Sequence, residues 1–149
     1  TGKRLYKLKK FFRKDENFML TYGDGLSSQN LSKLLKFHKK NKKIATVTAV
    51  RPPVRFGELK IIKNNVTSFR EKLQSRGSWI NGGFFVFNYK IFNYINDKNS
   101  MLEVEPINKL VKNKELNAFQ HYGFWQCMDT LRDKNFLNNL LKRRKAPWI

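Results

Sequence analysis

The sequence predicts an α/β protein with a mixed, mostly parallel sheet, flanking helices and a small antiparallel β excursion. Two observations lead to this prediction. Strand-like runs rich in β-branched and aromatic residues alternate with helix-spaced stretches near the start of the chain, and they follow one another directly in its middle. The 149 residues, 40% of them hydrophobic and 13 of them Phe, are enough for one domain with a substantial core.

The first fifty residues alternate helical and extended patterns. Apolar residues at helical spacing predict helices, and runs of β-branched or aromatic residues predict strands. The resulting order is helix 5–13, strand 18–22, helix 30–40 and strand 44–50. Ser27 or Ser28 is expected to cap the second helix, because a side-chain hydroxyl can accept a hydrogen bond from a free backbone N–H group.

The middle of the chain is predicted to be mainly extended. A turn at Pro52-Pro53 is followed by expected strands over residues 59–62, 66–70 and 80–87. The residues Lys63-Asn64-Asn65 between the first two of these strands are typical of a hairpin turn. This hairpin is the antiparallel excursion from the main sheet.

Helical patterns return beyond residue 88. The expected order is a helical stretch over 89–94, a helix over 106–112, a strand over 116–122 and a helix over 131–142. Pro106 suits the first turn of its helix, where a missing N–H costs nothing. Residues 1–149 are expected to form one domain, and the opening at Thr1 in a polar turn suggests a piece of a longer polypeptide.

The net charge of +20, from 31 Lys and Arg against 11 Asp and Glu, admits two interpretations. One is an anionic partner such as nucleic acid, a membrane surface or phosphorylated small molecules. The other is composition alone, with most Lys simply exposed to water. The sequence contains no ordered nucleic-acid-binding motif, and its apolar runs stay far below the roughly 18 residues of a membrane helix. Nucleic-acid binding is therefore the weaker interpretation, and no membrane association is expected.

Cysteine and histidine give little sign of metal or redox chemistry. The single cysteine, Cys127, excludes an internal disulfide and suits a reducing, cytoplasmic location. It is expected to be a small buried residue, because the sequence shows no base partner for it. His38 and His121 have no second His or Cys at ligand spacing, which does not favour a zinc site.

Two short acidic motifs stand out in this basic chain. Tyr22-Gly23-Asp24-Gly25 and residues 125–130, which close on Asp129-Thr130, each place one Asp soon after an aromatic-rich run. The two carboxylates are 105 residues apart (129 − 24). Carboxylates just past strand ends can hold a hard cation such as Mg²⁺, which can neutralise the charge of a phosphate substrate. For Gly23-Asp24-Gly25 the alternative is a tight turn between strand and helix.

Two further motifs lie near the middle of the chain. Glu71 and Lys72 follow an expected strand, and a Lys beside a cleft can hold a phosphate as a point charge, although solvated surface is the ordinary alternative. The Gly82-Gly83 pair inside an apolar strand indicates a bulge or the close approach of a ligand. Asn81 beside this pair offers donors and acceptors for sugar hydroxyls. A bulge that serves packing alone is the other interpretation.

Taken in order, these motifs resemble the glucose-1-phosphate cytidylyltransferase family, sugar-nucleotide pyrophosphorylases of the nucleotidyltransferase superfamily. The motifs that carry the resemblance are Tyr22-Gly23-Asp24-Gly25, residues 52–57, Phe69-Arg70-Glu71-Lys72, residues 79–86, residues 123–133 and Lys145-Ala146-Pro147-Trp148. The resemblance runs along the whole chain but covers only the later part of such an enzyme. The family's opening Gly-rich loop, which holds the triphosphate, has no counterpart in this sequence. A Rossmann-like nucleotidyltransferase sheet is the implied fold.

The resemblance implies a role for each matching residue. The Mg²⁺ ligands would be Asp24 and Asp129. Arg4 would contact the nucleotide side, and Gly23, beside Asp24, would lie at the nucleotide or sugar phosphate. The sugar 1-phosphate pocket would be lined by Gly57, Glu71, Lys72, Asn81 and Gly82. With Lys72 on the phosphate, the catalytic set would be Asp24, Lys72 and Asp129.

The implied reaction is the Mg²⁺-dependent in-line displacement that converts CTP and α-D-glucose 1-phosphate into CDP-glucose and pyrophosphate, a step of nucleotide-sugar synthesis for O-antigen lipopolysaccharide. A homo-oligomer is also implied. Leu73 and Cys127 stand where the family usually has Pro, so the turns there are expected to be less rigid. Two alternatives stay open: a catalytically inactive fragment and a basic nucleic-acid-binding module.

Overall fold

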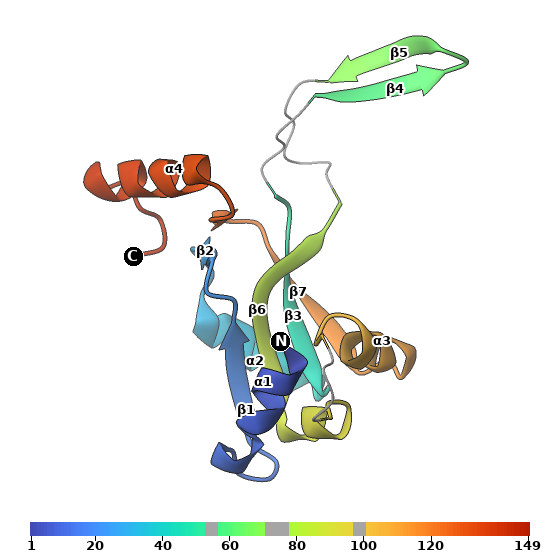
Figure 1. Cartoon of the computed structure of the whole chain (residues 1–149), viewed down its shortest axis with the longest axis vertical. Coiled ribbons are helices and arrows are strands. Elements are labelled where there is room, and N and C mark those ends of the chain that lie inside the picture. The colour runs from blue at the N-terminus through green and yellow to red at the C-terminus, as the bar shows by residue number, and fades with distance from the viewer. Residues whose placement is uncertain (53–56, 71–77, 97–100) are drawn as a thin grey trace. The chain divides into compact units, whose positions relative to one another are not determined.

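The computed structural model describes residues 1–52, 57–70, 78–96 and 101–149 (Figure 1). These residues form two compact units, each assembled from separate stretches of the chain. The first unit consists of Thr1–Gly23, Asn30–Thr48 and Gly83–Gln120. The second consists of Asp24–Gln29, Ala49–Gly82 and His121–Ile149. Glu71, Lys72 and Leu73, and Pro53 of the expected Pro52-Pro53 turn, lie outside the described residues.

Most of the four-stranded sheet belongs to the first unit. Its strands lie in the order β1 (Asn17–Thr21), β6 (Ile80–Asn88), β3 (Ala45–Val50) and β7 (Leu116–His121). The strands β1 and β6 are antiparallel, with Asn17 opposite Asn88 and Thr21 opposite Phe84. The observed strands agree within one or two residues with those expected over 18–22, 44–50, 80–87 and 116–122.

Hydrogen bonds at the strand ends give the remaining directions. The N–H of Asn88, at the end of β6, donates to the carbonyl of Ile44, just before β3, so these strands run antiparallel (2.8 Å). The N–H of Ala45, at the start of β3, donates to the carbonyl of Glu115, just before β7, so these strands run parallel (3.1 Å). The α/β class and the mixed sheet are therefore confirmed.

The balance of strand directions differs from the expected mostly parallel sheet. Among the described ladders of this sheet, two pairs are antiparallel and one is parallel, because β6 lies between β1 and β3. The core of β6 is apolar on both faces, a pattern typical of a parallel strand buried under helices. Here helices cover both faces of a mixed sheet. The apolar run therefore indicates that β6 is buried, but it does not indicate whether β6 runs parallel or antiparallel to its neighbours.

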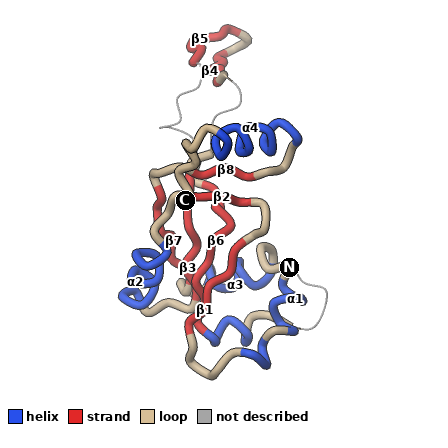
Figure 2. Tube along the Cα trace, turned by 90° about the vertical axis from the view of Figure 1, so that its left-hand side faces the viewer, coloured by secondary structure: helices blue, strands red, loops and turns tan. Residues whose placement is uncertain are grey.

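Helices lie on both faces of this sheet (Figure 2). One face carries α1 (Gly2–Lys7) and α3 (Glu105–Lys112), with the 3-10 turns η1 (Lys9–Phe11) and η3 (Tyr89–Asn93) in the same unit; the other carries α2 (Leu31–Asn41). The helix expected over 5–13 is thus a short α-helix followed by a 3-10 turn. Buried apolar side chains of the first unit form one core cluster that includes Leu5, Phe18, Phe85, Phe87, Phe92 and Leu110.

The N-terminus of α2 corrects one expectation. Its cap is Asn30, whose side-chain oxygen accepts a hydrogen bond from the N–H of Lys33 at 2.9 Å. Ser27 and Ser28 do not serve as this cap, because Ser27 ends a short strand and both residues precede the position of the cap. The helix ends at Lys42, which adopts a left-handed conformation with φ of 53°.

The second unit contains two small antiparallel pairs and one helix. The pair β2 (Gly25–Ser27) and β8 (Trp125–Cys127) joins distant parts of the chain, whereas β4 (Glu58–Ile62) and β5 (Asn65–Arg70) form the expected hairpin. Its turn places Lys63 and Asn64 at positive φ, as two-residue hairpin turns require. The helix α4 (Leu131–Lys142) matches its expected range. Within the described residues, no helix has the length and apolar character needed to cross a membrane.

Candidate functional site

The pairing of β2 with β8 brings the two acidic motifs together in the second unit. Gly25 lies opposite Cys127 and Ser27 lies opposite Trp125. The ladder continues past the strand ends: the N–H of Met128 donates to the carbonyl oxygen of Asp24 at 2.8 Å. Asp24 and Asp129 therefore sit at the same end of this ladder, although 105 residues (129 − 24) separate them in the sequence.

Both carboxylates face water. The side chains of Asp24 and Asp129 are exposed, and the thiol of Cys127 donates to Oδ2 of Asp129 at 3.1 Å. This contact holds one carboxylate oxygen of Asp129 and leaves its other oxygen accessible. Cys127 is half-buried, whereas the sequence predicted a buried residue, and its thiol contacts the Asp129 carboxylate.

Asp24 and Asp129 fit a magnesium ion that is bound partly by the protein and partly by substrate phosphate oxygens. Within the described part of the chain, no group of three or more His, Cys, Asp or Glu side chains could enclose a metal. Mg²⁺ commonly binds through one or two carboxylates and completes its shell with water and substrate phosphate oxygens. Two exposed carboxylates at one ladder end match that donor set, whereas an all-protein cage is not formed by the described residues.

The segment after Asp129 is held by a buried carboxylate that the sequence interpretation overlooked. Thr130 and Asp133 form a capping box at the start of α4, with the Thr130 hydroxyl donating to Oδ2 of Asp133 at 2.7 Å. The side chain of Gln126 donates to Oδ1 of the same carboxylate at 3.1 Å. Both oxygens of Asp133 are thus engaged in positioning the chain on either side of Asp129. The spacing of Thr130 and Asp133 is a capping-box signal that was readable from the sequence.

The expected sugar side is described only in part. Asn81 and Gly82 lie at the start of β6, where Asn81 is exposed and Gly82 is buried. The indole N–H of Trp125 donates to the carbonyl oxygen of Gly82 at 2.8 Å, which joins this strand to β8. Gly57 is exposed and directly precedes β4. The structure therefore brings the Asn81-Gly82 pair to the strand that leads to Asp129, while Glu71 and Lys72 fall outside the described residues.

A cationic and aromatic stack lies beside the Asn81-Gly82 pair and was not found from the sequence. The Arg51 guanidinium carbon lies 4.6 Å from the centre of the Trp79 ring, a cation–π geometry. The Tyr122 ring meets the Trp79 ring edge-on at 5.3 Å between centroids. Arg51 follows β3, Trp79 precedes β6 and Tyr122 follows β7, so only the folded sheet assembles them.

In the first unit, the chain is tightly held just before Gly23. The Tyr22 N–H donates to the carbonyl of Gly83 at 2.9 Å, and its hydroxyl donates to Glu103. Burial raises the pKa of Glu103, but hydrogen bonds from Tyr22 and Thr1 outweigh it and hold that pKa below its usual value. A Cβ on Gly83, whose φ is 76°, would lie 2.9 Å from the Tyr22 ring. The glycine pair is therefore explained at Gly83 by close packing and by a left-handed backbone.

Two residues expected on the nucleotide side lie in the first unit. A Cβ built on Gly23 would meet nothing within 4 Å, so the backbone there is open to a ligand. Arg4 lies on α1 with an exposed side chain. Both are accessible, as a contact with a substrate requires.

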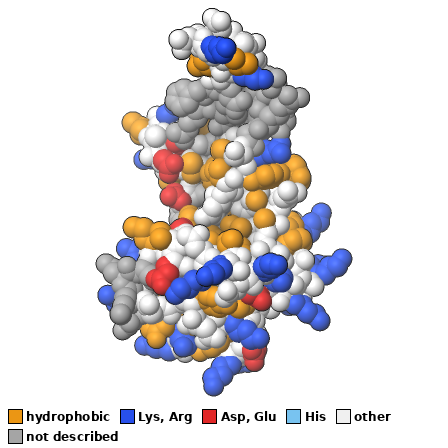
Figure 3. Space-filling model, turned by 90° about the vertical axis from the view of Figure 1, so that its right-hand side faces the viewer, with side chains coloured by type: hydrophobic (Ala, Val, Ile, Leu, Met, Phe, Trp, Pro, Cys, Tyr) orange, Lys and Arg blue, Asp and Glu red, His pale blue; other side chains and the backbone are white. Residues whose placement is uncertain are grey.

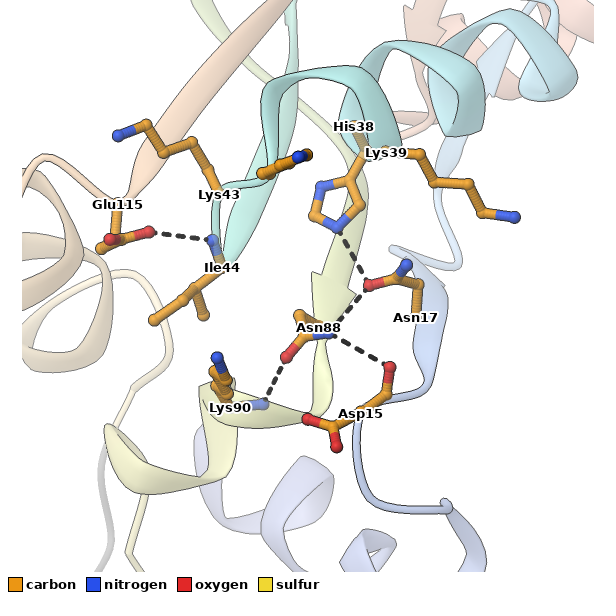
Figure 4. A pocket seen from close by; sticks show the side chains of 10 residues that line it. Asp15, Asn17, His38, Lys39, Lys43, Ile44, Asn88, Lys90 and Glu115 are labelled. Atoms are coloured by element: carbon orange, nitrogen blue, oxygen red, sulfur yellow. Dashed lines mark hydrogen bonds between the residues drawn. The ribbon is translucent and has the colours of Figure 1, made fainter.

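The histidines have structural partners. His38 is buried; its Nδ1 lies 2.9 Å from the Thr46 hydroxyl oxygen and its Nε2 lies 3.3 Å from Oδ1 of Asn17. The same oxygen accepts from Asn88, so one amide links α2 to β1 and β6 (Figure 4). Asn17, His38 and Asn88 line a cavity of about 350 Å³ within the first unit. None of the candidate site residues lines this cavity. Burial lowers the pKa of His38, which fits a neutral, structural imidazole.

Positive charge is not concentrated on the face drawn in Figure 3. Lys and Arg side chains there are scattered among hydrophobic, acidic and uncharged ones. A nucleic-acid-binding surface usually gathers such residues on one face or along one helix. The visible distribution therefore adds no support to a nucleic-acid-binding module.

The family of this chain follows from its similarity to known proteins. The family model described as nucleotidyl transferase matches residues 1–133. The chain therefore belongs to the nucleotidyl transferase family.

Within that family, two relatives carry the name glucose-1-phosphate cytidylyltransferase. The proteins of Salmonella typhimurium and Salmonella typhi are each 46% identical over 148 residues, covering 99% of this chain and 58% of the relative. The chain thus spans 58% of the length of these curated relatives. The crystal structure of HddC from Yersinia pseudotuberculosis matches with a TM-score of 0.61 at 21% identity, over 91% of this chain and 60% of HddC, which shows the shared fold. The resemblance drawn from the motifs is confirmed.

Proposed function

We propose that this chain supplies the metal and sugar-phosphate part of a glucose-1-phosphate cytidylyltransferase, forming CDP-glucose and pyrophosphate from CTP and α-D-glucose 1-phosphate. The observation that carries the proposal is the pairing of β2 with β8, which sets Asp24 and Asp129 at one ladder end. Relatives of that name at 46% identity support the choice of substrates.

The chemistry needs little proton transfer. A phosphate oxygen of glucose 1-phosphate, already an anion, attacks the α-phosphorus of CTP while the bond to the β-phosphate breaks and pyrophosphate leaves. Mg²⁺, when held by Asp24 and Asp129, would neutralise charge on the phosphate oxygens. Catalysis of such a displacement depends on positioning and on charge stabilisation more than on acid or base groups.

The remaining candidate residues have binding roles in this proposal. Lys72 holds the sugar phosphate, and Glu71 and Asn81 bind hexose hydroxyls. Gly57 and Gly82 allow backbone to approach the sugar closely, while Arg4 and Gly23 contact the nucleotide phosphates. The exposed positions of Asn81, Gly57, Gly23 and Arg4 are compatible with these contacts.

The test uses the complete polypeptide that carries this chain. It is incubated with CTP, glucose 1-phosphate and Mg²⁺, and both CDP-glucose and pyrophosphate are quantified. Equal amounts of the two products are expected, with formation lost when EDTA removes the metal and when any one substrate is omitted. ATP, GTP and UTP serve as competing nucleotides, and mannose 1-phosphate serves as the competing sugar. Failure to form CDP-glucose with Mg²⁺ present would contradict the proposal.

A further inference from the structure

The hydrogen bond between Trp125 and Gly82 joins two motifs that lie 43 residues apart in the sequence. The donor is the indole N–H of Trp125 on β8, four residues before Asp129. The acceptor is the carbonyl of Gly82 on β6, which directly follows Asn81. Both residues belong to the second unit, so the contact lies within one compact body.

The local geometry makes this bond hard to replace. Gly82 is buried, and its carbonyl oxygen accepts from the indole N–H at 2.8 Å. A buried carbonyl that loses its hydrogen-bond donor remains removed from water without a partner. The resulting desolvation penalty is larger than the net contribution of an ordinary hydrogen bond to stability. Removal of the indole N–H would therefore release the start of β6 from β8 instead of leaving it in place.

The other side of Asn81 is also held. Trp79, two residues before it, has the Arg51 guanidinium over its ring at 4.6 Å and meets the Tyr122 ring edge-on at 5.3 Å. The short segment from Trp79 to Gly82 is thus anchored at both ends by aromatic side chains. Asn81, exposed between the two anchors, is the residue whose position they determine.

We propose that Trp125 is a positioning residue for the sugar phosphate. Its indole N–H holds the Gly82 backbone, and through it Asn81, at a set place relative to the strand that leads to Asp129. The hexose 1-phosphate is thereby placed against the metal-binding carboxylate without contact between Trp125 and any substrate. The inference rests on the proposed function, because the sugar role of Asn81 belongs to it.

Two variants of the complete polypeptide remove the donor. Trp125→Phe removes the N–H and shrinks the ring. Replacement of Trp125 by benzothienylalanine keeps the bicyclic shape and removes the N–H alone. Trp148→Phe is the matched control, because Trp148 is also half-buried in the second unit and packs on the Phe124 ring at 5.4 Å. Thermal unfolding of each protein confirms that the variants are folded.

The readout is the set of kinetic constants together with binding of glucose 1-phosphate alone. Both Trp125 variants are expected to raise KM for glucose 1-phosphate about tenfold and to leave KM for CTP within about twofold, as loss of one buried hydrogen bond predicts. They should also weaken the rise in melting temperature that glucose 1-phosphate produces in the wild type. Trp148→Phe should change neither quantity.

The outcomes separate this inference from the proposed function. If the wild type forms CDP-glucose and the benzothienylalanine variant has the same KM for glucose 1-phosphate as the wild type, the positioning role is overturned while the proposed function stands. Equal increases in KM for both substrates would also overturn it, because they indicate general loosening of the site. A wild type that forms no CDP-glucose overturns both.

Discussion

Different kinds of interaction stabilise the interior of each of the two units. In the first unit, a cluster of aromatic and aliphatic side chains is buried between the sheet and its helices. In the second unit the fully buried apolar side chains are few among the described residues, and polar side chains such as Gln126 and Asp133 hold short strands to a helix start. The apolar packing of the first unit suits a stable scaffold, whereas the polar contacts of the second unit lie next to residues of the candidate site.

The polar groups of the two units differ in the same way. In the first unit, His38, Asn17 and Asn88 satisfy one another around the cavity, and in Figure 4 the side chains of Lys39 and Lys43 extend away from the imidazole. In the second unit, Asp24 and Asp129 are exposed and can accept further partners. Substitution of a buried side chain should therefore change stability, most strongly in the first unit, whereas substitution of the exposed carboxylates of the second unit should change activity.

The largest effect on stability is expected at Phe87, which is fully buried in the first unit and packs against the rings of Phe85 and Phe18. Phe87→Ala should lower the free energy of unfolding by about 4 kcal/mol, through lost burial and the cavity left behind. The matched control is Phe69→Ala on the hairpin, where the ring is 69% exposed, and its effect should stay below about 0.5 kcal/mol. Urea unfolding measures both, and equal losses would contradict the contrast between the units.

The largest effect on activity is expected at Asp129. Asp129→Asn keeps the size of this exposed side chain and removes its charge, so Mg²⁺-dependent CDP-glucose formation should fall by at least about a hundredfold with little change in stability. Asp15→Asn is the control in the first unit, since Asp15 is exposed at φ of 66°, a conformation that Asn tolerates. The measurement is initial rate against Mg²⁺ concentration. Equal rates for Asp129→Asn and Asp15→Asn would exclude a metal role for Asp129.

The regular elements could be predicted because their patterns are local. The β-branched run before Val50 and the helical spacing after Leu131 place β3 and α4 close to their observed bounds. Strands of three residues such as β2 and β8 show no periodicity, and they exist only because they pair with each other across the chain.

The same limit applies to the site. Asp24 and Asp129 could be identified from their place after aromatic runs, but their common ladder end depends on long-range pairing. The bond from Trp125 to Gly82 and the stack of Arg51 on Trp79 join residues with no shared motif. By contrast, the capping box of Thr130 and Asp133 is a local signal that pattern reading could have found.

A smaller loss of stability is expected at Asp133, the buried polar anchor of the second unit. Asp133→Ala removes half of the capping box and one partner of Gln126, and it should lower the free energy of unfolding by about 1–2 kcal/mol. Asn135→Ala, on an exposed position of the same helix, is the control. Chemical unfolding of both variants tests this. No difference between them would mean that the polar contacts do not hold this helix start.

The smallest effect is a pH dependence located in the first unit. Burial lowers the pKa of His38 from its ordinary value of 6.5, so below that pH the unfolded chain takes up a proton that the folded chain resists. Stability should therefore be constant above pH 6.5 and fall as the pH drops from there toward the folded pKa, by at most about 1.4 kcal/mol per pH unit. The pKa of Glu103 is also lowered, but from 4.5, so its contribution to the free energy of unfolding is nearly constant over this pH range.

Unfolding free energies at pH 7.5 and 5.5 test this contribution in wild type, His38→Gln and His121→Gln. The wild type and His121→Gln should lose stability on acidification, whereas His38→Gln should lose less by the part that His38 contributes. The acidic and basic groups around the cavity, among them Asp15, Glu115 and Lys90, are common to all three proteins and cancel in the comparison. An unchanged pH dependence in His38→Gln would show that the imidazole takes up a proton as readily in the folded chain as in the unfolded chain. The contrast between the two units would then fail at this buried polar residue of the first unit.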